Sequence, residues 1–326
     1  MRRAATAPLP AAPRRGWTTA WVAAVPLALA LAAVLAVLWG QHSSRPAPEP
    51  PPAVVRALSA APGAAAERVL AATFPAADLP ASEAEAVFYR FALQPGAVAP
   101  FLPGPFVHGR QEPVGEGVGA ELVVAGSYAL EVAAPVLVRR AATPATEETV
   151  APGLEVLLGP GDAVTYPDYA APADVRNDGD EPAIVVGVAI IADDPAAPPV
   201  LTLPPGVSGE QLAQAATADL ASLPSTALAV GIWRLRLPPG TSFGPYETAG
   251  LEALRVEQGA VERAFLRPGE AQPARPPRPH SAGTTAPFLP PAPGVRRVVA
   301  HAGDGPAEVL ALTIEPVGLH PLSLSV

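Results

Sequence analysis

The chain has no cysteine, no lysine and only five histidines among its 326 residues. Without cysteine it can form neither a disulfide framework nor a thiolate metal site. No two histidines lie within five residues of each other, so an imidazole metal site would have to be assembled from distant parts of the fold. We therefore expect neither a metal ion nor another cofactor. The histidines are His42, His108, His280, His301 and His320.

Positive charge is also scarce. The 21 basic residues are all arginine, against 30 Asp and Glu, which gives a formal net charge of -9. Four of these arginines lie in the first 16 residues, so the remainder of the chain is more acidic still. Nucleic-acid binding depends on basic contacts to phosphate. The composition therefore predicts that nucleic acid is not a partner.

A long uncharged run follows the basic arm of residues 1–16. It covers residues 17–40, and its central part, Trp21–Trp39, is almost wholly apolar. About 20 apolar residues in a helix cross a bilayer, and indole rings such as that of Trp17 favour its two interfaces. The alternative is a cleaved signal peptide, but signal cores run to about 7–15 residues, so this length favours a retained single-pass anchor. The excess of arginine before the run places the N-terminus in the cytoplasm and the rest of the chain outside the cell membrane.

Residues 41–72 are predicted to form a stalk and connector. Five prolines occur within the nine residues Arg45–Ala53. Such a run adopts extended polyproline II and acts as a semi-rigid spacer. In residues 54–72 we expect short helical turns, broken at Pro62-Gly63.

From about residue 84 the pattern is that of short β-strands. Ala86–Leu93 fits a strand, and apolar residues alternate with arginines in Trp233–Leu237. Glycine- and proline-rich turns separate the apolar runs, which indicates an all-β sandwich or barrel. The one soluble helix that the sequence predicts is Ser208–Leu223. It divides the body into blocks 73–205 and 206–326.

The two blocks resemble each other. Leu93–Ala97 (LQPGA) matches Leu237–Thr241 (LPPGT), and Asn177–Ile190 (NDGDEPAIVVGVAI) matches His301–Ile314 (HAGDGPAEVLALTI). The order of the matches is preserved, and the first block carries about 20 extra residues, which we place around 97–119. A duplicated β unit accounts for this pattern.

One stretch of the second block carries a family resemblance. Gly240–Gly259 (GTSFGPYETAGLEALRVEQG) has the spacing G-x5-Y-x-T-x3-E-x6-G. It resembles the first motif of the cupin superfamily, G-x5-H-x-H-x3-E-x6-G. Tyr246 and Thr248 stand where the motif has its two metal-binding histidines, whereas Glu252 and both glycines are kept.

The second cupin motif, G-x5-P-x-G-x2-H-x3-N, is resembled more loosely. In the first block it runs from Gly161 to Asn177, with Ala173 at the histidine position; in the second block that position falls on Arg297. The resemblance covers roughly residues 84–318. It implies two tandem cupin-like, RmlC-like barrels of the double-stranded β-helix (jelly-roll) type, following one N-terminal transmembrane helix.

A cupin metal centre needs about three imidazoles and a carboxylate. In the first block the glutamate position falls near Gly119, with Glu116 and Glu121 as near misses, and the second block keeps only Glu252. The resemblance therefore implies barrels without a metal centre. Because Glu252 has the strand parity of Leu254, it should face inward.

A buried carboxylate needs a partner, and for Glu252 we expect Arg297 or Tyr246. Glu252 is then either a polar anchor for a ligand or a structural residue. Tyr166 and Tyr169 either line the mouth of the first barrel or are ordinary structural residues. The candidate ligand-binding residues are Tyr246, Thr248, Glu252, Arg297, Tyr166 and Tyr169.

These observations predict a membrane-tethered, extracytoplasmic bicupin that binds a small ligand or a partner protein. Two alternatives stay open. The first is a cupin-type isomerase, lyase or oxygenase that uses a non-standard metal site, or metal-free acid/base chemistry by Glu252 with Tyr246. The second is an adhesive β-sandwich of another family. The sequence identifies no catalytic residue and leaves the oligomeric state open.

Overall fold

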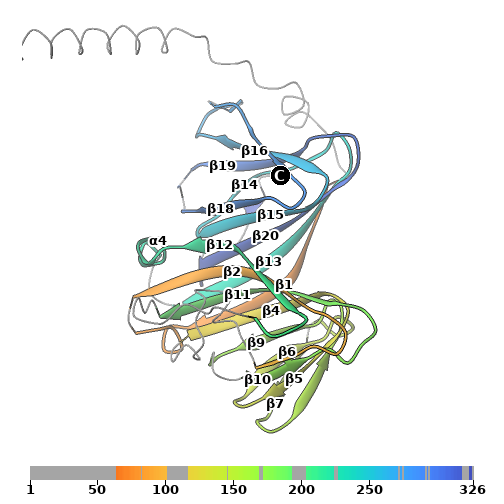
Figure 1. Ribbon diagram of the computed structural model, residues 1–326. Helices are drawn as coiled ribbons and strands as arrows, with labels where there is room; N and C mark the ends of the chain where they lie inside the picture. Colours follow the sequence, from red (N-terminus) through yellow and green to blue (C-terminus); the bar gives the residue numbers. More distant parts are fainter. Residues whose placement is uncertain are drawn as a thin grey trace, which may run out of the picture. The chain divides into compact units, whose positions relative to one another are not determined.

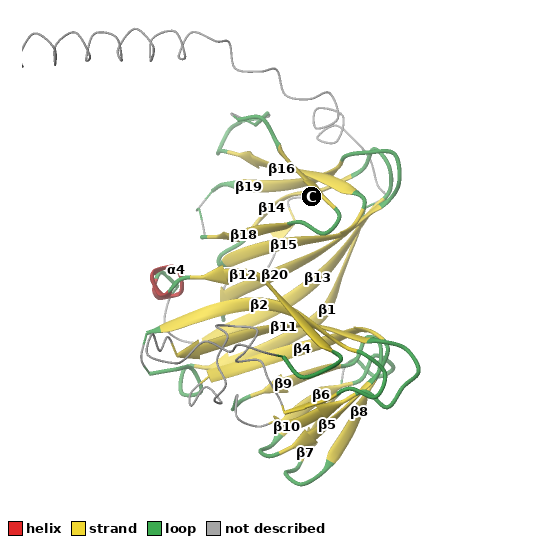
Figure 2. Cartoon of the chain, in the orientation of Figure 1, coloured by secondary structure: helices red, strands yellow, loops and turns green. Residues whose placement is uncertain are grey.

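The computed structural model describes residues 64–81, 83–100, 117–144, 146–168, 172–192, 203–223, 227–270, 272–273, 275–290, 292, 294–317 and 323–324. The basic arm, the predicted membrane span 17–40 and the proline-rich run lie outside the described residues. Within the described part, no helix has both the length and the apolar character needed to cross a bilayer. This part is nearly all β, as the sequence predicts (Figure 2).

The strands fall into two consecutive groups along the chain. Those of the first block are β2 (Ala84–Leu93), β3 (Val98–Pro100), β4 (Gly117–Ala125), β5 (Tyr128–Val132), β6 (Val136–Arg139), β7 (Glu147–Val150), β8 (Glu155–Leu158), β9 (Ala163–Tyr166), β10 (Pro172–Arg176) and β11 (Ala183–Ala192). Those of the second are β13 (Ala227–Leu237), β14 (Ser242–Glu247), β15 (Leu251–Gln258), β16 (Ala260–Leu266), β17 (Arg278–Ser281), β18 (Thr285–Leu289), β19 (Arg296–His301), β20 (Ala307–Pro316) and β21 (Ser323–Leu324).

Both blocks have the same strand order. In the first, one sheet contains the order β2-β11-β4-β9 and a second sheet the order β3-β10-β5-β8. The corresponding orders in the second block are β13-β20-β15-β18 and β14-β19-β16-β17. The internal repeat that the sequence predicts is therefore present in the topology. We call the two-sheet units barrel 1 and barrel 2.

Two further strands, β1 (Ala65–Pro75) and β12 (Val207–Ala215), each precede one barrel in the chain and pair with a strand of the other barrel. β1 precedes barrel 1 in the chain but pairs with β13 of barrel 2, and β12 follows barrel 1 and pairs with its β2 (Figure 1). The expected helical turns in residues 54–72 are thus wrong from Ala65 onward.

The predicted interdomain helix Ser208–Leu223 is also wrong. It is strand β12, followed by the five-residue helix α4 (Thr217–Ala221). The alanine- and leucine-rich composition favours a helix locally, but pairing along the edge of β2 satisfies the backbone of this segment as a strand. It also buries Leu212, Ala213 and Ala215 between the barrels.

Alternation along the strands divides most buried apolar residues of the described part among three large clusters, and a fourth, small cluster lies on β16 and β19. In β2, Val87, Tyr89 and Phe91 face the interior of barrel 1, whereas Ala86 and Phe88 face the core between the barrels. Strands β13, β15 and β20 contribute in the same way to the core between the barrels and to the interior of barrel 2. The large sheets of the two barrels therefore pack against each other.

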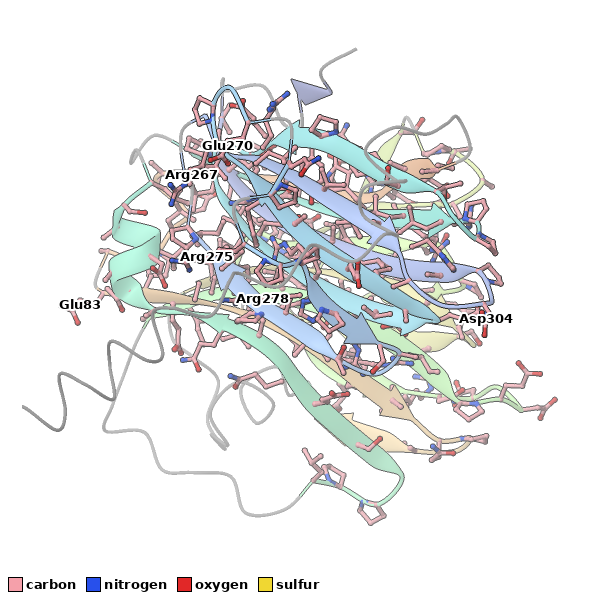
Figure 3. The ribbon with its side chains drawn as sticks, turned by 90° about the horizontal axis from the view of Figure 1, so that it is seen from above. Glu83, Arg267, Glu270, Arg275, Arg278 and Asp304 are labelled. Atoms are coloured by element: carbon pink, nitrogen blue, oxygen red, sulfur yellow. The ribbon has the colours of Figure 1, made fainter. Side chains whose placement is uncertain are left out.

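The barrels differ in the connection between two paired strands. Between β5 and β8, barrel 1 has the hairpin β6–β7, so the extra residues expected around 97–119 are only part of its insertion. Between β16 and β17, barrel 2 instead has a proline- and arginine-rich loop. This loop carries Arg267, Glu270 and Arg275, and Figure 3 shows them on one side of the barrel.

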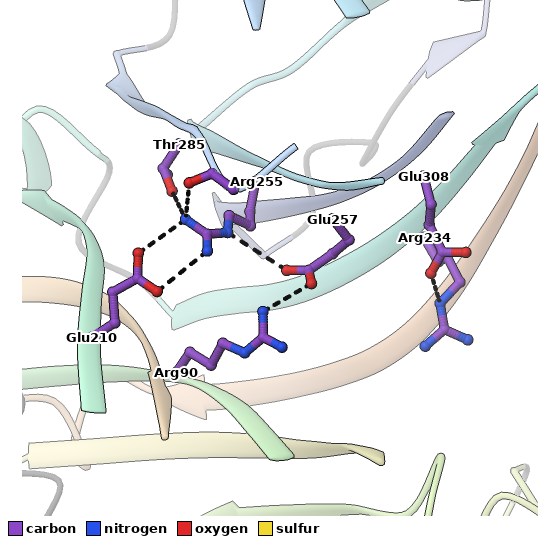
Figure 4. Close-up of polar contacts among 8 residues, drawn as sticks. Arg90, Glu210, Arg234, Arg255, Glu257, Thr285 and Glu308 are labelled. Atoms are coloured by element: carbon purple, nitrogen blue, oxygen red, sulfur yellow. Dashed lines mark hydrogen bonds and ion pairs between the residues drawn. The ribbon is translucent and has the colours of Figure 1, made fainter. Parts of the chain in front are cut away.

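Charged residues also join the barrels. Arg90 of β2 forms an ion pair with Glu257 of β15 at 2.9 Å. Arg255 of β15 donates from its two terminal nitrogens to the two carboxylate oxygens of Glu210 of β12, at 3.0 and 3.2 Å (Figure 4). Arg255 also donates to Oγ1 of Thr285 at 3.1 Å. This bidentate geometry favours one relative position of the two sheets.

Candidate functional site

The two motif glycines adopt backbone conformations that other residues rarely adopt. Gly240 has φ +75° at the turn before β14, and Gly259 has φ +71° at the turn after β15. A Cβ atom on Gly259 would lie 2.5 Å from the carbonyl oxygen of Pro306. These turns fix β14 and β15 so that Tyr246 and Glu252 both point into barrel 2.

Glu252 is at the centre of a buried polar cluster. Its side chain is 1% exposed. Oε1 accepts a hydrogen bond from the Tyr246 hydroxyl at 2.5 Å, and Oε2 accepts from Arg263 Nη2 at 2.7 Å and from Arg297 Nη1. The inward orientation and both expected partners are confirmed. Arg263 was missed, although its parity with Val261 on β16 indicates an inward position.

The two arginines determine the charge of Glu252. Burial raises the pKa of a carboxyl group, but the guanidinium groups of Arg263 and Arg297 outweigh it and hold the pKa of Glu252 below its ordinary value. Burial, together with the neighbouring carboxylate, raises the pKa of Tyr246 well above its ordinary value. The cluster therefore contains an ionised carboxylate, two cations and a protonated phenol.

Thr248 belongs to a different contact. Its hydroxyl donates to Oε1 of the buried Glu315 at 2.8 Å, and it accepts from the Gly250 backbone N–H at 3.2 Å. Burial raises the pKa of Glu315, so this acid stays protonated to higher pH than usual. The structure thus brings Tyr246, Glu252 and Arg297 together and places Thr248 beside another carboxyl group.

This donor set does not fit a metal ion. Of the positions where the cupin motifs have ligands, Tyr246 and Arg297 are themselves donors to Glu252, the one carboxylate that is kept. A cation at Glu252 would have to displace two guanidinium groups or lie beside them. Among the described residues, no group of three or more His, Asp or Glu is arranged to hold a metal.

The described histidines have other surroundings. The His301 ring lies between two turns: Nδ1 accepts from the Gly240 backbone N–H at 3.3 Å, and Nε2 is 2.5 Å from the Gly305 carbonyl oxygen. Asn177, at the matching position of barrel 1, also joins separate segments, because its Nδ2 donates to the carbonyl oxygens of Leu93 and Glu181. His42, His108 and His320 lie outside the described residues.

Barrel 1 has its own buried carboxyl group, Glu121. Its oxygens accept from the hydroxyls of Tyr89 at 2.7 Å, Tyr128 at 2.8 Å and Tyr166 at 2.8 Å. Burial raises its pKa more than these three hydrogen bonds lower it. The Tyr89 ring reaches Glu121 across Gly187, where a Cβ atom would lie 2.5 Å from the ring.

Glu121 lies two residues beyond the motif position, which is Gly119. Gly119 pairs with Ala189, and in barrel 2 Glu252 pairs with Thr313, the residue that matches Ala189 in the repeat. The two carboxyl groups therefore face inward at different depths. Tyr166 is fully buried against Glu121, which favours the second of its two alternatives, an ordinary structural residue. Tyr169 lies outside the described residues.

A cavity of about 400 Å³ opens at one end of barrel 2. Arg263 and Arg297 belong to both its wall and the Glu252 cluster, so this cluster forms its polar floor. Figure 3 shows Arg267, Arg275 and Arg278 on this side of the molecule, far from Asp304. The lining residues are Arg263, Ala264, Phe265, Arg267, Arg275, Pro276, Arg278, Leu289, Pro290, Ala292, Val295 and Arg297.

No protein-family model and no curated protein matches the sequence. Several solved structures are similar in fold.

Oxalate decarboxylase of Lactobacillus farciminis, in a formate complex, has 12% identity and a TM-score of 0.38, over 78% of this chain and 83% of that one. A cupin 2 conserved barrel domain protein from Leptotrichia buccalis has 10% identity and a TM-score of 0.30, over 83% and 99% of the two chains. An RmlC-like cupin from Methanocaldococcus jannaschii has 14% identity and a TM-score of 0.22, over 26% and 70%. At these values we draw no functional conclusion from the matches.

Proposed function

We propose that the described part of the chain is a bicupin that binds a small molecule in the cavity of barrel 2. The repeated strand order and the glycine-bounded motif around Glu252 support the bicupin assignment. The cavity carries the functional proposal. Its lining combines arginines with apolar residues such as Phe265, Leu289 and Val295, and an apolar wall with converging polar groups is typical of small-molecule sites.

The polar floor suits binding better than acid/base catalysis. A general base or acid works best with a pKa near the operating pH. The pKa of Glu252 is shifted downward and that of Tyr246 upward, so both move away from neutrality. Glu252 keeps Arg263 and Arg297 in place, and both arginines belong to the lining of the cavity.

We further propose that residues 17–40 anchor the chain in the bilayer as a single-pass helix. The length of the uncharged run and the arginine asymmetry support this proposal. The barrels would then lie outside the cell membrane and meet extracytoplasmic ligands, with no nucleic-acid partner.

A thermal-shift screen of the full-length protein tests the binding proposal. The screen covers neutral, cationic and anionic metabolites, and a true ligand raises the melting temperature by mass action. Ala292→Trp places a bulky ring at the exposed rim of the cavity and should abolish the shift. Ala151→Trp, at an exposed turn of barrel 1, is the matched control and should keep it. A screen in which no compound gives a shift that depends on Ala292 would contradict the proposal.

A further inference from the structure

The cavity of barrel 2 is unusually rich in positive charge for an acidic protein. Five arginines are among the described residues that line it, and none of these lining residues is acidic. The rest of the lining is apolar. A charge excess of this kind, gathered around one concave site of a chain with net charge -9, points to recognition of an anion.

Only part of this charge is neutralised within the protein. Glu252 carries one negative charge against Arg263 and Arg297. Among the described residues, no ion pair joins Arg267, Arg275 or Arg278 to an acid. At least three guanidinium groups are thus available to a ligand.

Glu270, the acidic residue nearest to Arg267 in the sequence, does not neutralise the arginines of the cavity. Glu270 lies in the loop that carries Arg267, and its carboxylate accepts the Arg267 backbone N–H at 3.0 Å. It is absent from the cavity wall. Its contact with the backbone leaves the Arg267 guanidinium group unneutralised.

Two observations deeper in barrel 2 also indicate a positive potential at the cavity. Arg263 is 2% exposed, and its Nε has no hydrogen-bond partner among the described residues, which is costly for a buried donor. His280 lies on β17, where burial and then the charges of Arg263 and Arg278 lower its pKa. The potential at this end of the barrel is therefore positive, and a buried donor at the wall lacks an acceptor.

Resting on the function proposed above, we propose that the ligand presents a phosphate monoester to this cavity. A monocarboxylate is satisfied by one or two guanidinium groups, as Glu252 itself shows. A phosphate monoester carries about -1.5 to -2 charges at pH 7 and three strong acceptor oxygens, which several planar guanidinium groups match bidentately. The apolar wall formed by Phe265, Leu289 and Val295 would contact the organic part of the ester.

Phosphate monoesters occur both as soluble metabolites and as the headgroup of phosphatidate, so the experiment has two arms. In the first, the full-length protein is titrated by calorimetry with inorganic phosphate, glycerol 3-phosphate, succinate and glycerol. In the second, its binding to phosphatidylcholine vesicles with and without phosphatidate is measured. Binding in the first arm identifies a soluble ester as the source, and binding in the second alone identifies the lipid.

Arg275→Gln combined with Arg278→Gln should weaken phosphate-ester binding by about tenfold or more per arginine, and added salt should weaken it further. Arg176→Gln combined with Arg236→Gln removes the same charge from exposed sites elsewhere and should leave the affinity unchanged. Succinate should bind more weakly than glycerol 3-phosphate.

Absence of phosphate-ester binding in both arms, or equal affinity in the two double variants, would overturn the inference. The proposed function can survive that result. A neutral or carboxylate compound that stabilises the wild type but not Ala292→Trp would show that the cavity binds a ligand of another class. If no compound of any charge raises the melting temperature of the wild type more than that of Ala292→Trp, the proposed function fails as well.

Discussion

Replacing Arg297 with methionine should lower the free energy of unfolding of the full-length protein by about 3–5 kcal/mol, the usual cost of breaking a buried ion pair from one side. Arg297 is 2% exposed and donates to Glu252, which is 1% exposed. Its loss leaves the carboxylate with Arg263 as its only cationic partner and leaves the Pro290 carbonyl oxygen without its 3.1 Å donor. Urea denaturation followed by far-ultraviolet circular dichroism measures the change.

Arg236→Met is the control for this loss. Arg236 is also paired with acids, at 3.5 and 3.9 Å, but its side chain is 54% exposed, so its removal should change stability by no more than about 1 kcal/mol. The double variant Glu252→Gln/Arg297→Met should lose less than the sum of its single variants, because Arg297→Met removes one of the two buried cations that Glu252→Gln leaves without a carboxylate. Equal effects of Arg297→Met and Arg236→Met would contradict a buried ion pair in barrel 2.

The buried carboxyl groups of Glu121 and Glu252 should give opposite pH signatures. Glu121 has a pKa above its ordinary value of 4.5, so the folded state holds its proton more tightly than the unfolded state. As the pH rises above 4.5, the unfolded state releases this proton before the folded state does, so the free energy of unfolding of the wild type falls. Glu121→Gln has no proton to release, so its stability relative to wild type should rise over the same pH range. The measurement is the free energy of unfolding at a series of pH values.

For Glu252 the sign is reversed. Its pKa lies below 4.5, so its stabilising contribution is complete above that pH and is lost as the pH falls through the lowered value. Glu252→Gln should therefore be about 3–5 kcal/mol less stable than wild type near neutrality. The deficit should shrink on acidification. For each variant, the quantity to follow is its difference from wild type in free energy of unfolding. If this difference changes with pH in the same direction for Glu121→Gln and Glu252→Gln, the assigned charge states are wrong.

Strand parity accounts for most of what the sequence could predict. It placed Glu252 inside barrel 2, because the pattern of alternate residues needs no knowledge of tertiary structure. The resemblance to the cupin motifs, whose histidine positions fall on Tyr246 and Arg297, supplied the expected partners. The match of Asn177–Ile190 to His301–Ile314 likewise predicted the equivalence of β11 and β20.

Other features depend on tertiary pairing and could not be read in the same way. The β12 segment has a helix-favouring composition, and only the edge of β2 makes it a strand. β1 crosses to barrel 2, which no local pattern indicates. Glu121 is displaced by two residues from the motif, and its three tyrosines come from strands far apart in the sequence.

The cavity was missed for a related reason. Arg267 and Arg275 lie in a proline-rich loop without strand or helix periodicity, so the sequence does not show that they approach Arg263 and Arg297. Only the closure of barrel 2 brings the loop over the polar floor. The feature that carries the functional proposal is therefore a property of the fold.

The central claim is that arginine, and not a metal ion, neutralises Glu252 at the floor of the cavity. Its most direct test is the metal content of the purified full-length protein, compared with that of Glu252→Gln. The account predicts manganese, iron, nickel and zinc far below one equivalent per chain in both proteins. One equivalent of any of these metals in the wild type, lost in Glu252→Gln, would contradict it.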